Sequence, residues 1–234
     1  PPILIHGAGW TSGCENWALA MGPLSQKLRV IAIDCLNWGT GDIFNQEMSF
    51  AYLVDHVREF MDVMGIDKAN FVGHSMGGML ATRYALLYPD NVDALFLVNP
   101  IGLEDWLAKG VPYVSIKDWY KNQLTLTTKR ARAYQQKTYY AGQWRDDYQK
   151  WVDMLMIQYR ADKEDSAWLS AIHYDMILTQ PVVHEFDQLS VPTWLFIGEK
   201  DNTAIGKAFV PDDIKKQLGN YPVLARKTAK AIPD

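Results

Sequence analysis

The chain has 234 residues, of which 48% are hydrophobic and 21% are charged, with a formal net charge of −4 and a pI near 5.7. This length supports one good buried core, so we expect a single α/β domain with an insertion rather than two independent domains. The acidic balance and the lack of basic runs argue against nucleic acid and anionic membrane surfaces as partners. No apolar stretch approaches the ~20 residues of a membrane span.

Two cysteines, Cys14 and Cys35, could pair if their loops meet, but two free thiols in a reducing compartment are the simpler expectation. That reading favours a cytoplasmic location over a periplasmic or secreted one. The sequence contains neither His-x-x-x-His nor Cys-x-x-Cys spacing, so we expect no metal and no cofactor. The oligomeric state is left open.

The chain opens on an apolar strand, Pro2-Ile3-Leu4-Ile5, that runs into the glycine-rich segment His6-Gly7-Ala8-Gly9-Trp10. Such a loop can present backbone N–H groups to an anion. A second buried strand is expected at Val30 to Asp34, and a polar, glycine-containing loop follows it from Asn37 to Asp42.

A helix is predicted from Ser49 to Met64, because apolar residues recur there at helical spacing and Gly65 supplies the stop. Its apolar face is expected to pack on the sheet. His56 falls on the polar face, and we interpret it as a solvated histidine.

The next segment is the most informative in the chain. A β-like run, Ala69 to Val72, breaks into Gly73-His74-Ser75-Met76-Gly77, and a helical pattern continues to Tyr88 before a strand at Val92 to Asn99. Gly-x-Ser-x-Gly between a strand and a helix is typical of a nucleophile elbow, which exposes the Ser Oγ on a strained turn. The N–H groups of Ala8 and Met76 would then form an oxyanion hole. The alternative is that Ser75 merely caps the helix.

After Leu103 the alternation of strands and helices stops until about Gln188. The segment contains many aromatic residues: Trp106, Tyr113, Trp119, Tyr120, Tyr134, Tyr139, Tyr140, Trp144, Tyr148, Trp151, Tyr159, Trp168 and Tyr174. A final apolar strand, Val191 to Ile197, leads to Gly198 and an acidic loop that contains Glu199 and Asp201.

Over nearly its whole length this order of elements resembles the α/β-hydrolase superfamily. The resemblance implies a mostly parallel sheet with helices on both faces and an inserted helical cap. The core would comprise residues 1–102 and 189–234, and the cap residues 103–188. Such caps supply most of the substrate pocket, and this one suits a hydrophobic or aromatic small molecule. Any single cap aromatic can equally be a packing residue, so none is assigned to binding.

Locally the chain also resembles the carbon–carbon hydrolases of meta-cleavage pathways. The resemblance lies in the segment that runs from His6 through Trp17 and Gly22-Pro23-Leu24 to Asp34, and in Asn99-Pro100-Ile101-Gly102-Leu103. Those enzymes typically carry Asn before the nucleophile. This chain has His74, the commoner esterase form.

By the same resemblance Asp201 occupies the position of the triad acid, which orients the catalytic imidazole. Glu199 lies one position before the expected place. Asp105, after the preceding strand, is the next candidate, because some superfamily members place the acid there. A loop Asp that forms an Asx-turn is the structural alternative for Asp201.

The triad base is missing from the expected place. The five histidines are His6, His56, His74, His173 and His184. None follows Asp201, as the Ser, acid, His order of the fold requires. We expect the side chain of His6 to be structural and that of His74 to point away from the nucleophile. His173 and His184 lie in or beside the cap and would be unconventional bases.

The simplest expectation is that the sequence represents an incomplete chain, which also begins without Met. The competing interpretation is a native protein without a base, since binding modules have been built on this fold.

The sequence therefore predicts a serine hydrolase that cleaves a carboxylic ester or lactone through an acyl-enzyme. The runner-up is hydrolysis of a C–C bond, which needs a carboxylate-binding group, most naturally an arginine. Arg130, Arg132, Arg145 and Arg160 are available in the cap, although surface placement is the expectation for each. A catalytically inactive binding protein is the third reading.

Overall fold

The structure is a computed structural model that describes residues 1–9, 13–43 and 48–233. Trp10, at the end of the expected anion-binding loop, lies outside the described residues. Five parallel strands form one sheet in the order β2-β1-β3-β4-β5. The strands are β1 (Pro2–Ile5), β2 (Ile31–Ile33), β3 (Ala69–His74), β4 (Val92–Val98) and β5 (Thr193–Phe196). This architecture confirms the predicted α/β class.

Nine α-helices are present in the described part of the chain. They are α1 (Ala18–Ser25), α2 (Phe50–Val63), α3 (Met76–Leu87), α4 (Ile116–Gln123), α5 (Thr128–Thr138), α6 (Gln149–Ala161), α7 (Lys163–Thr179), α8 (Asp212–Lys215) and α9 (Tyr221–Ala231). Short 3-10 helices occur at η1 (Cys14–Trp17), η2 (Pro89–Asn91), η3 (Asp146–Tyr148), η4 (Phe186–Gln188) and η5 (Lys207–Phe209). Each described helix is too short or too polar to cross a bilayer.

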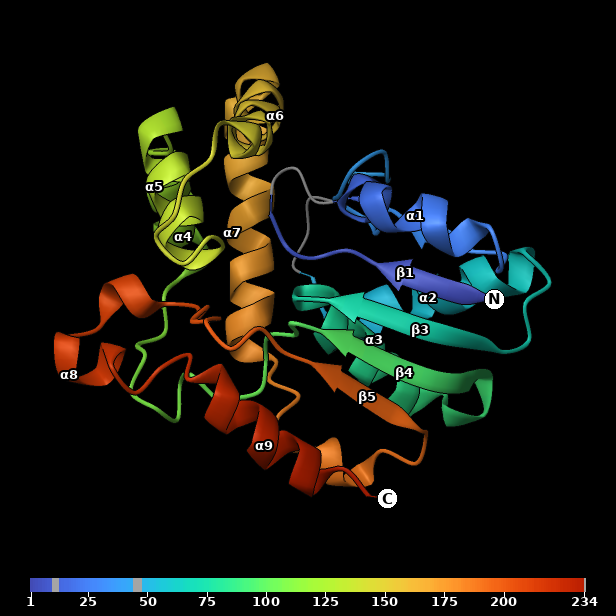
Figure 1. The fold of residues 1–234 in the computed structure, drawn as a ribbon. Helices are drawn as coiled ribbons and strands as arrows, with labels where there is room; N and C mark the ends of the chain where they lie inside the picture. The colour runs from blue at the N-terminus through green and yellow to red at the C-terminus, as the bar shows by residue number, and fades with distance from the viewer. Residues whose placement is uncertain (10–12, 44–47, 234) are drawn as a thin grey trace.

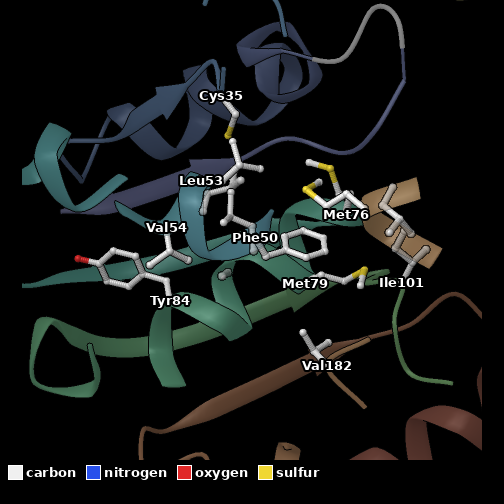
Figure 2. Close-up of a cluster of buried hydrophobic side chains, with 14 of the residues drawn as sticks. Cys35, Phe50, Leu53, Val54, Met76, Met79, Tyr84, Ile101 and Val182 are labelled. Carbon is white, nitrogen blue, oxygen red and sulfur yellow. The ribbon is translucent and has the colours of Figure 1, made fainter. Parts of the chain in front are cut away.

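The main core lies between the sheet and the helix pair α2 and α3. Helix α2 begins where the Ser49 hydroxyl accepts a hydrogen bond from the backbone N–H of Tyr52, and its apolar stripe is buried. Figure 2 shows Phe50 of α2 close to Met79 of α3. Both side chains are almost fully buried, so this packing fixes the helix that carries the predicted nucleophile.

All five strands run in the same direction, so their carboxyl ends meet at one edge of the sheet. In Figure 1 the arrowheads point toward α7, while α2 and α3 lie behind the sheet and α9 in front of it. The loops that follow β1, β3, β4 and β5 therefore gather at this edge. They contain the residues that the sequence singled out.

Helices α4 to α7 are inserted between β4 and β5, beyond the carboxyl edge of the sheet (Figure 1). Helix α7 joins the main core through residues such as Ile172 and Met176. Helices α5 and α6 share a smaller core around Val152 and Met156. The four helices fall within the predicted cap, whose limits at residues 103 and 188 remain our proposal.

Candidate active site

The turn between β3 and α3 is strained at Ser75, which has φ 54° and ψ −118°. A non-glycine residue at positive φ is unfavourable and persists only where its surroundings fix it. Here the Ser75 N–H donates to the carbonyl of Val98 at 3.2 Å, and the Ser75 carbonyl accepts from Ile101 at 3.2 Å. The end of β4 and the loop after it thus hold Ser75 at both of its backbone polar groups.

Two glycines let the turn close. A Cβ on Gly73 would lie 2.3 Å from the Gly77 carbonyl oxygen, and one on Gly77 would lie 2.4 Å from the His6 carbonyl oxygen. The side chain of Ser75 makes no cap hydrogen bond with α3. The helix-cap interpretation of Ser75 therefore has no support, and the residue is partly exposed at the sheet edge.

The loop after β1 lies directly against the nucleophile candidate. A Cβ on Gly7 would be 3.1 Å from the Ser75 Cβ, and Ala8 follows as a partly exposed residue. Met76 is the first residue of α3, so its N–H is in the helix's unsatisfied first turn. The assignment of Ala8 and Met76 to an oxyanion hole remains a prediction that suits this placement.

His6 is a structural residue whose ring is held on both sides. Its Nδ1 donates to the Gly7 carbonyl at 2.8 Å, and its Nε2 accepts from the Cys35 N–H at 3.1 Å. Burial lowers the pKa of His6 to about 4. The imidazole is therefore neutral at neutral pH and has no nitrogen left to act as a base.

His74 lies beside the loop after β1, and the expectation that it points away from the nucleophile stays a prediction. Its Nδ1 lies 3.1 Å from the position that a Cβ on Gly7 would take, as does the Ser75 Cβ. The imidazole and Ser75 thus contact the same side of Gly7. The ring also lies edge-on to Trp17, at 6.2 Å between centroids. Burial lowers the pKa of His74, while the charge of Asp201 opposes that shift.

Asp201 follows β5, and its carboxylate has two partners. One oxygen accepts from Asn99 Nδ2 at 2.8 Å, and the other accepts from the Thr203 N–H at 3.0 Å. Asn99 lies at the end of β4 with φ 43°, a conformation that Asn tolerates better than most residues. Sequence reasoning missed this role for Asn99, although an Asn directly after a strand at the predicted site edge was a usable signal.

Asp105, the alternative candidate for the triad acid, pairs with His184, one of the two unconventional candidates for the base. The His184 Nε2 lies 2.9 Å from an Asp105 oxygen, and the His184 side chain is 63% exposed. The neighbouring Glu185 binds Arg83 through both carboxylate oxygens, at 2.5 and 2.7 Å. Arg83 lies roughly 12 Å along α3 from Ser75 at ~1.5 Å per residue. The segment that contains His184 and Glu185 is therefore anchored to α3 at Arg83, away from the turn at Ser75.

Glu199 is exposed and lines an open groove of about 400 Å³ that also reaches Asp201. His56 is partly buried, and its Nδ1 donates to the Tyr52 carbonyl at 2.8 Å. Neither residue is placed at Ser75 by these contacts.

A small cavity lies between the loop after β1 and helix α7. Its volume is about 30 Å³, and it is lined by Ala8, Gly9, Ser170, His173, Tyr174 and Ile177. His173 is buried, stacks on Trp38 at 3.6 Å between centroids, and has its pKa lowered by burial to about 3. It is therefore neutral near pH 7, in a wall of the cavity beside Ala8.

The four cap arginines all lie at the surface. Arg130 donates to Asn122 and Thr125, and Arg132 stacks on Trp144. Arg145 and Arg160 bind Asp147 and Thr128 respectively. None of the four lines the cavity beside Ala8, as the sequence led us to expect.

Cys14, Glu15 and Asp34 bring potential metal ligands within 4.8 Å of one another. However, the Asp34 carboxylate already accepts from the Cys14 N–H and from the N–H and hydroxyl of Thr40. Burial and Asp34 raise the pKa of the Cys14 thiol, which disfavours the thiolate that a metal needs. Hydrogen bonding across two loops accounts for this cluster. Both cysteines are free thiols.

Comparison with known proteins agrees with this geometry. A solved structure of a probable hydrolytic enzyme from Pseudomonas aeruginosa PAO1 is 47% identical, with a TM-score of 0.93 over 99% of this chain and 75% of that chain. A 2-hydroxy-6-oxononadienedioate/2-hydroxy-6-oxononatrienedioate hydrolase of Comamonas testosteroni is 35% identical over 122 residues, which are 51% of this chain and 43% of that protein.

An abhydrolase domain-containing protein of Caenorhabditis elegans is 37% identical over 109 residues, which are 45% of this chain and 24% of that protein. The matched regions span about a quarter to a third of the first curated relatives, at 24%, 28% and 31% of their lengths. The profile of the alpha/beta hydrolase fold matches residues 1–223. The strained Ser75 turn, the parallel sheet and this match show that the chain belongs to the alpha/beta hydrolase fold family.

Proposed function

We propose that the protein is a serine hydrolase that cleaves a carboxylic ester or lactone of a hydrophobic or aromatic substrate. The observation that carries the proposal is the strained backbone of Ser75 at the carboxyl edge of the sheet, with Gly7 packed against it. Asp201, held by Asn99 in the neighbouring loop, is the proposed triad acid. No cofactor is required for this chemistry.

In this proposal the Ser75 Oγ attacks the carbonyl carbon, and the negative charge that develops on the carbonyl oxygen is bound by the N–H groups of Ala8 and Met76. The first turn of α3 adds the favourable end of the helix dipole. Collapse of the tetrahedral intermediate expels the alcohol and leaves an acyl-enzyme, which water then hydrolyses. Asp201 would orient and stabilise the imidazolium of the base.

The base is not assigned to His6, His173 or His184. The ring nitrogens of His6 are both engaged, and His184 pairs with Asp105 beside α3. His173 is a neutral buried ring with a pKa of about 3, too weak a base to take the proton of Ser75 at neutral pH.

Two observations favour ester or lactone hydrolysis over cleavage of a C–C bond. The surface position of the cap arginines leaves the carboxylate of a C–C substrate without the expected partner. The residue before the nucleophile is also His74, a partly buried ring whose pKa burial lowers, rather than the Asn typical of those enzymes. C–C hydrolysis stays the second candidate because of the relative from Comamonas testosteroni, and a non-catalytic binding protein stays the third.

The test uses the natural full-length gene product and a fluorophosphonate probe, which labels activated serines. We expect labelling of the wild type and none of Ser75→Ala. The matched control is Ser25→Ala, since Ser25 lies on α1 and donates to the Gly22 carbonyl. Equal labelling of the Ser75 variant would refute the nucleophile assignment.

The substrate class is tested in parallel with medium-chain esters, aryl esters and a vinylogous 1,5-diketone acid. Turnover of the esters alone supports our first choice. Cleavage of the diketone acid alone supports C–C hydrolysis instead. If no probe labels the protein and no substrate is cleaved, the result supports the non-catalytic binding protein.

A further inference from the structure

Glu104 is a buried carboxylate that the proposed chemistry does not use. It lies in the loop after β4, and its side chain is 2% exposed. Its Oε1 accepts from the Trp106 indole N–H at 3.1 Å and from the Gly219 backbone N–H at 2.8 Å, and its Oε2 binds the Lys109 ammonium. Trp106 and Lys109 belong to the same loop, whereas Gly219 lies 115 residues further along, just before α9. A carboxylate is costly to bury unless such donors satisfy it, and these donors make Glu104 a link between the two segments.

Gly219 packs tightly on the loop that carries Asp201. It has φ +73°, and a Cβ there would lie 2.6 Å from the Asn202 carbonyl oxygen and 3.1 Å from the Thr203 carbonyl oxygen. Glycine suits both this conformation and this close approach. Because Glu104 holds the Gly219 N–H, it fixes how the segment before α9 lies against Asn202 and Thr203.

Lys207 joins the same two segments a second time. Its ammonium donates to the Asn202 carbonyl at 3.1 Å and to the Leu218 carbonyl at 3.2 Å. The backbone N–H of Thr203 in turn donates to Oδ1 of Asp201 at 3.0 Å. The links through Glu104 and Lys207 therefore hold the backbone that follows Asp201 and that supplies a hydrogen bond to its carboxylate.

We propose that Glu104 and Lys207 are positioning residues for the triad acid. They fix the Thr203 N–H that holds Oδ1 of Asp201, while Asn99 holds Oδ2. This inference rests on the proposed serine hydrolase function, in which Asp201 is the acid. A carboxylate that shifts by a fraction of an ångström orients and stabilises the imidazolium less well. Loss of either link should therefore slow the attack of the serine.

The test measures the rate constant of fluorophosphonate labelling in the natural full-length gene product. Labelling reports activation of the serine and needs no identified substrate. We expect Glu104→Leu, which fills the space but offers no acceptor, to slow labelling roughly 10-fold. Glu104→Gln still offers an oxygen to the Gly219 N–H and should be labelled at close to the wild-type rate.

The same substitution in an Asp201→Asn background separates positioning from a general loss of structure. A residue that acts through Asp201 loses its effect once that carboxylate is removed. We therefore expect Glu104→Leu to cause no further loss there. A folded Glu104→Leu protein that is labelled at the wild-type rate, or that loses the same factor in both backgrounds, would overturn the inference.

If Glu104→Leu does not fold, Lys207→Met decides in the same two backgrounds, because it removes the second link. A slower rate that disappears in the Asp201→Asn background supports the inference, and an unchanged rate or an equal loss in both overturns it. Lys215→Met is the matched control and should be labelled like the wild type, since Lys215 lines the same groove but binds Asp212 within α8. An Asp201→Asn protein labelled as fast as the wild type would instead refute the proposed acid, a result distinct from those of the Glu104 and Lys207 variants.

Discussion

At the scale of single residues, the site depends on two non-glycine residues with positive φ. Ser75 and Asn99 have φ 54° and 43° and follow neighbouring strands. Each such conformation costs on the order of 1–3 kcal/mol and must be maintained by surrounding contacts. Ser75 remains partly exposed at the sheet edge, and the side chain of Asn99 donates to Asp201.

Asn99→Ala tests whether Asn99 positions the acid. The variant removes a hydrogen bond to a carboxylate, so we expect kcat to fall roughly 10- to 100-fold with little change in KM. Asn91→Ala is the control, since Asn91 of η2 donates to the Asp67 carbonyl. Steady-state kinetics of the full-length protein on an ester that it cleaves supply the measurement. An Asn99→Ala enzyme with the wild-type kcat would show that Asp201 needs no such support.

At the scale of elements, β3, its turn and α3 form one rigid unit against the loop after β1. The contact is too close for any side chain at Gly77. Helix α3 is in turn tied to the segment after α7 by Arg83 and Glu185, a bidentate pair of partly buried charges. The helix that carries the proposed oxyanion donor is thereby held at its first turn and, further along, at Arg83.

Gly77→Ala should destabilise this unit, because the new Cβ would lie 2.4 Å from a backbone oxygen of His6. We expect the free energy of unfolding to fall by roughly 1–3 kcal/mol and serine labelling to weaken as the loop is displaced. Gly22→Ala on α1 is the matched control, because its Cβ would meet nothing within 4 Å. That change should be neutral or stabilising by up to ~1 kcal/mol. Chemical denaturation measures the free energy of unfolding of both variants. Equal stability of Gly77→Ala and Gly22→Ala would contradict the packing argument.

At the scale of the whole molecule, a cluster of three rings joins the sheet to the cap. Trp38 lies 5.5 Å from His6 and 3.6 Å from His173 between ring centroids. The two imidazoles come from β1's loop and α7, far apart in the chain. Both rings are neutral because burial lowers their pKa values. For His6, the charge of Asp34 raises the pKa and His74 lowers it further. For His173, the nearby His6 lowers the pKa further.

Stability should consequently fall in mild acid. The pKa values of His6 and His173 are lowered from 6.5 to about 4 and about 3, so below pH 6.5 the unfolded chain binds more protons than the folded one. The free energy of unfolding therefore decreases as the pH drops from 6.5 and levels off only below the folded pKa values. Over that window, protonation of each ring lowers the free energy of unfolding by on the order of 3 kcal/mol or more.

The measurement is the thermal unfolding midpoint between pH 7.5 and 4.5. In the His173→Phe variant the midpoint should decrease less as the pH drops, whereas in the His56→Phe variant it should decrease as in the wild type. The carboxylates of Asp34 and Asp105, with pKa values lowered from 3.8, lose their contribution only in stronger acid. A midpoint that stays constant down to pH 4.5 would rule out the buried neutral pair.

The sequence by itself determined the strands, the helix pattern and the elbow, since local periodicity and turn chemistry need no partner. Runs such as Ala69–His74 are hydrophobic enough to be buried, and Gly73 and Gly77 are placed where only glycine fits. Alternating strands and helices then required a parallel sheet with its site at the carboxyl edge. The position of Ser75 at that edge followed directly.

Contacts between distant segments were decided only by the tertiary structure. The bond of Asn99 to Asp201 and the pairing of Asp105 with His184 each join residues whose side-chain directions no local pattern encodes. The same holds for His173, which reads as an ordinary cap residue until α7 places it against Trp38 and Ala8. Local sequence fixes backbone geometry through short-range sterics and hydrophobic period, whereas side-chain partners depend on how the packed elements finally meet.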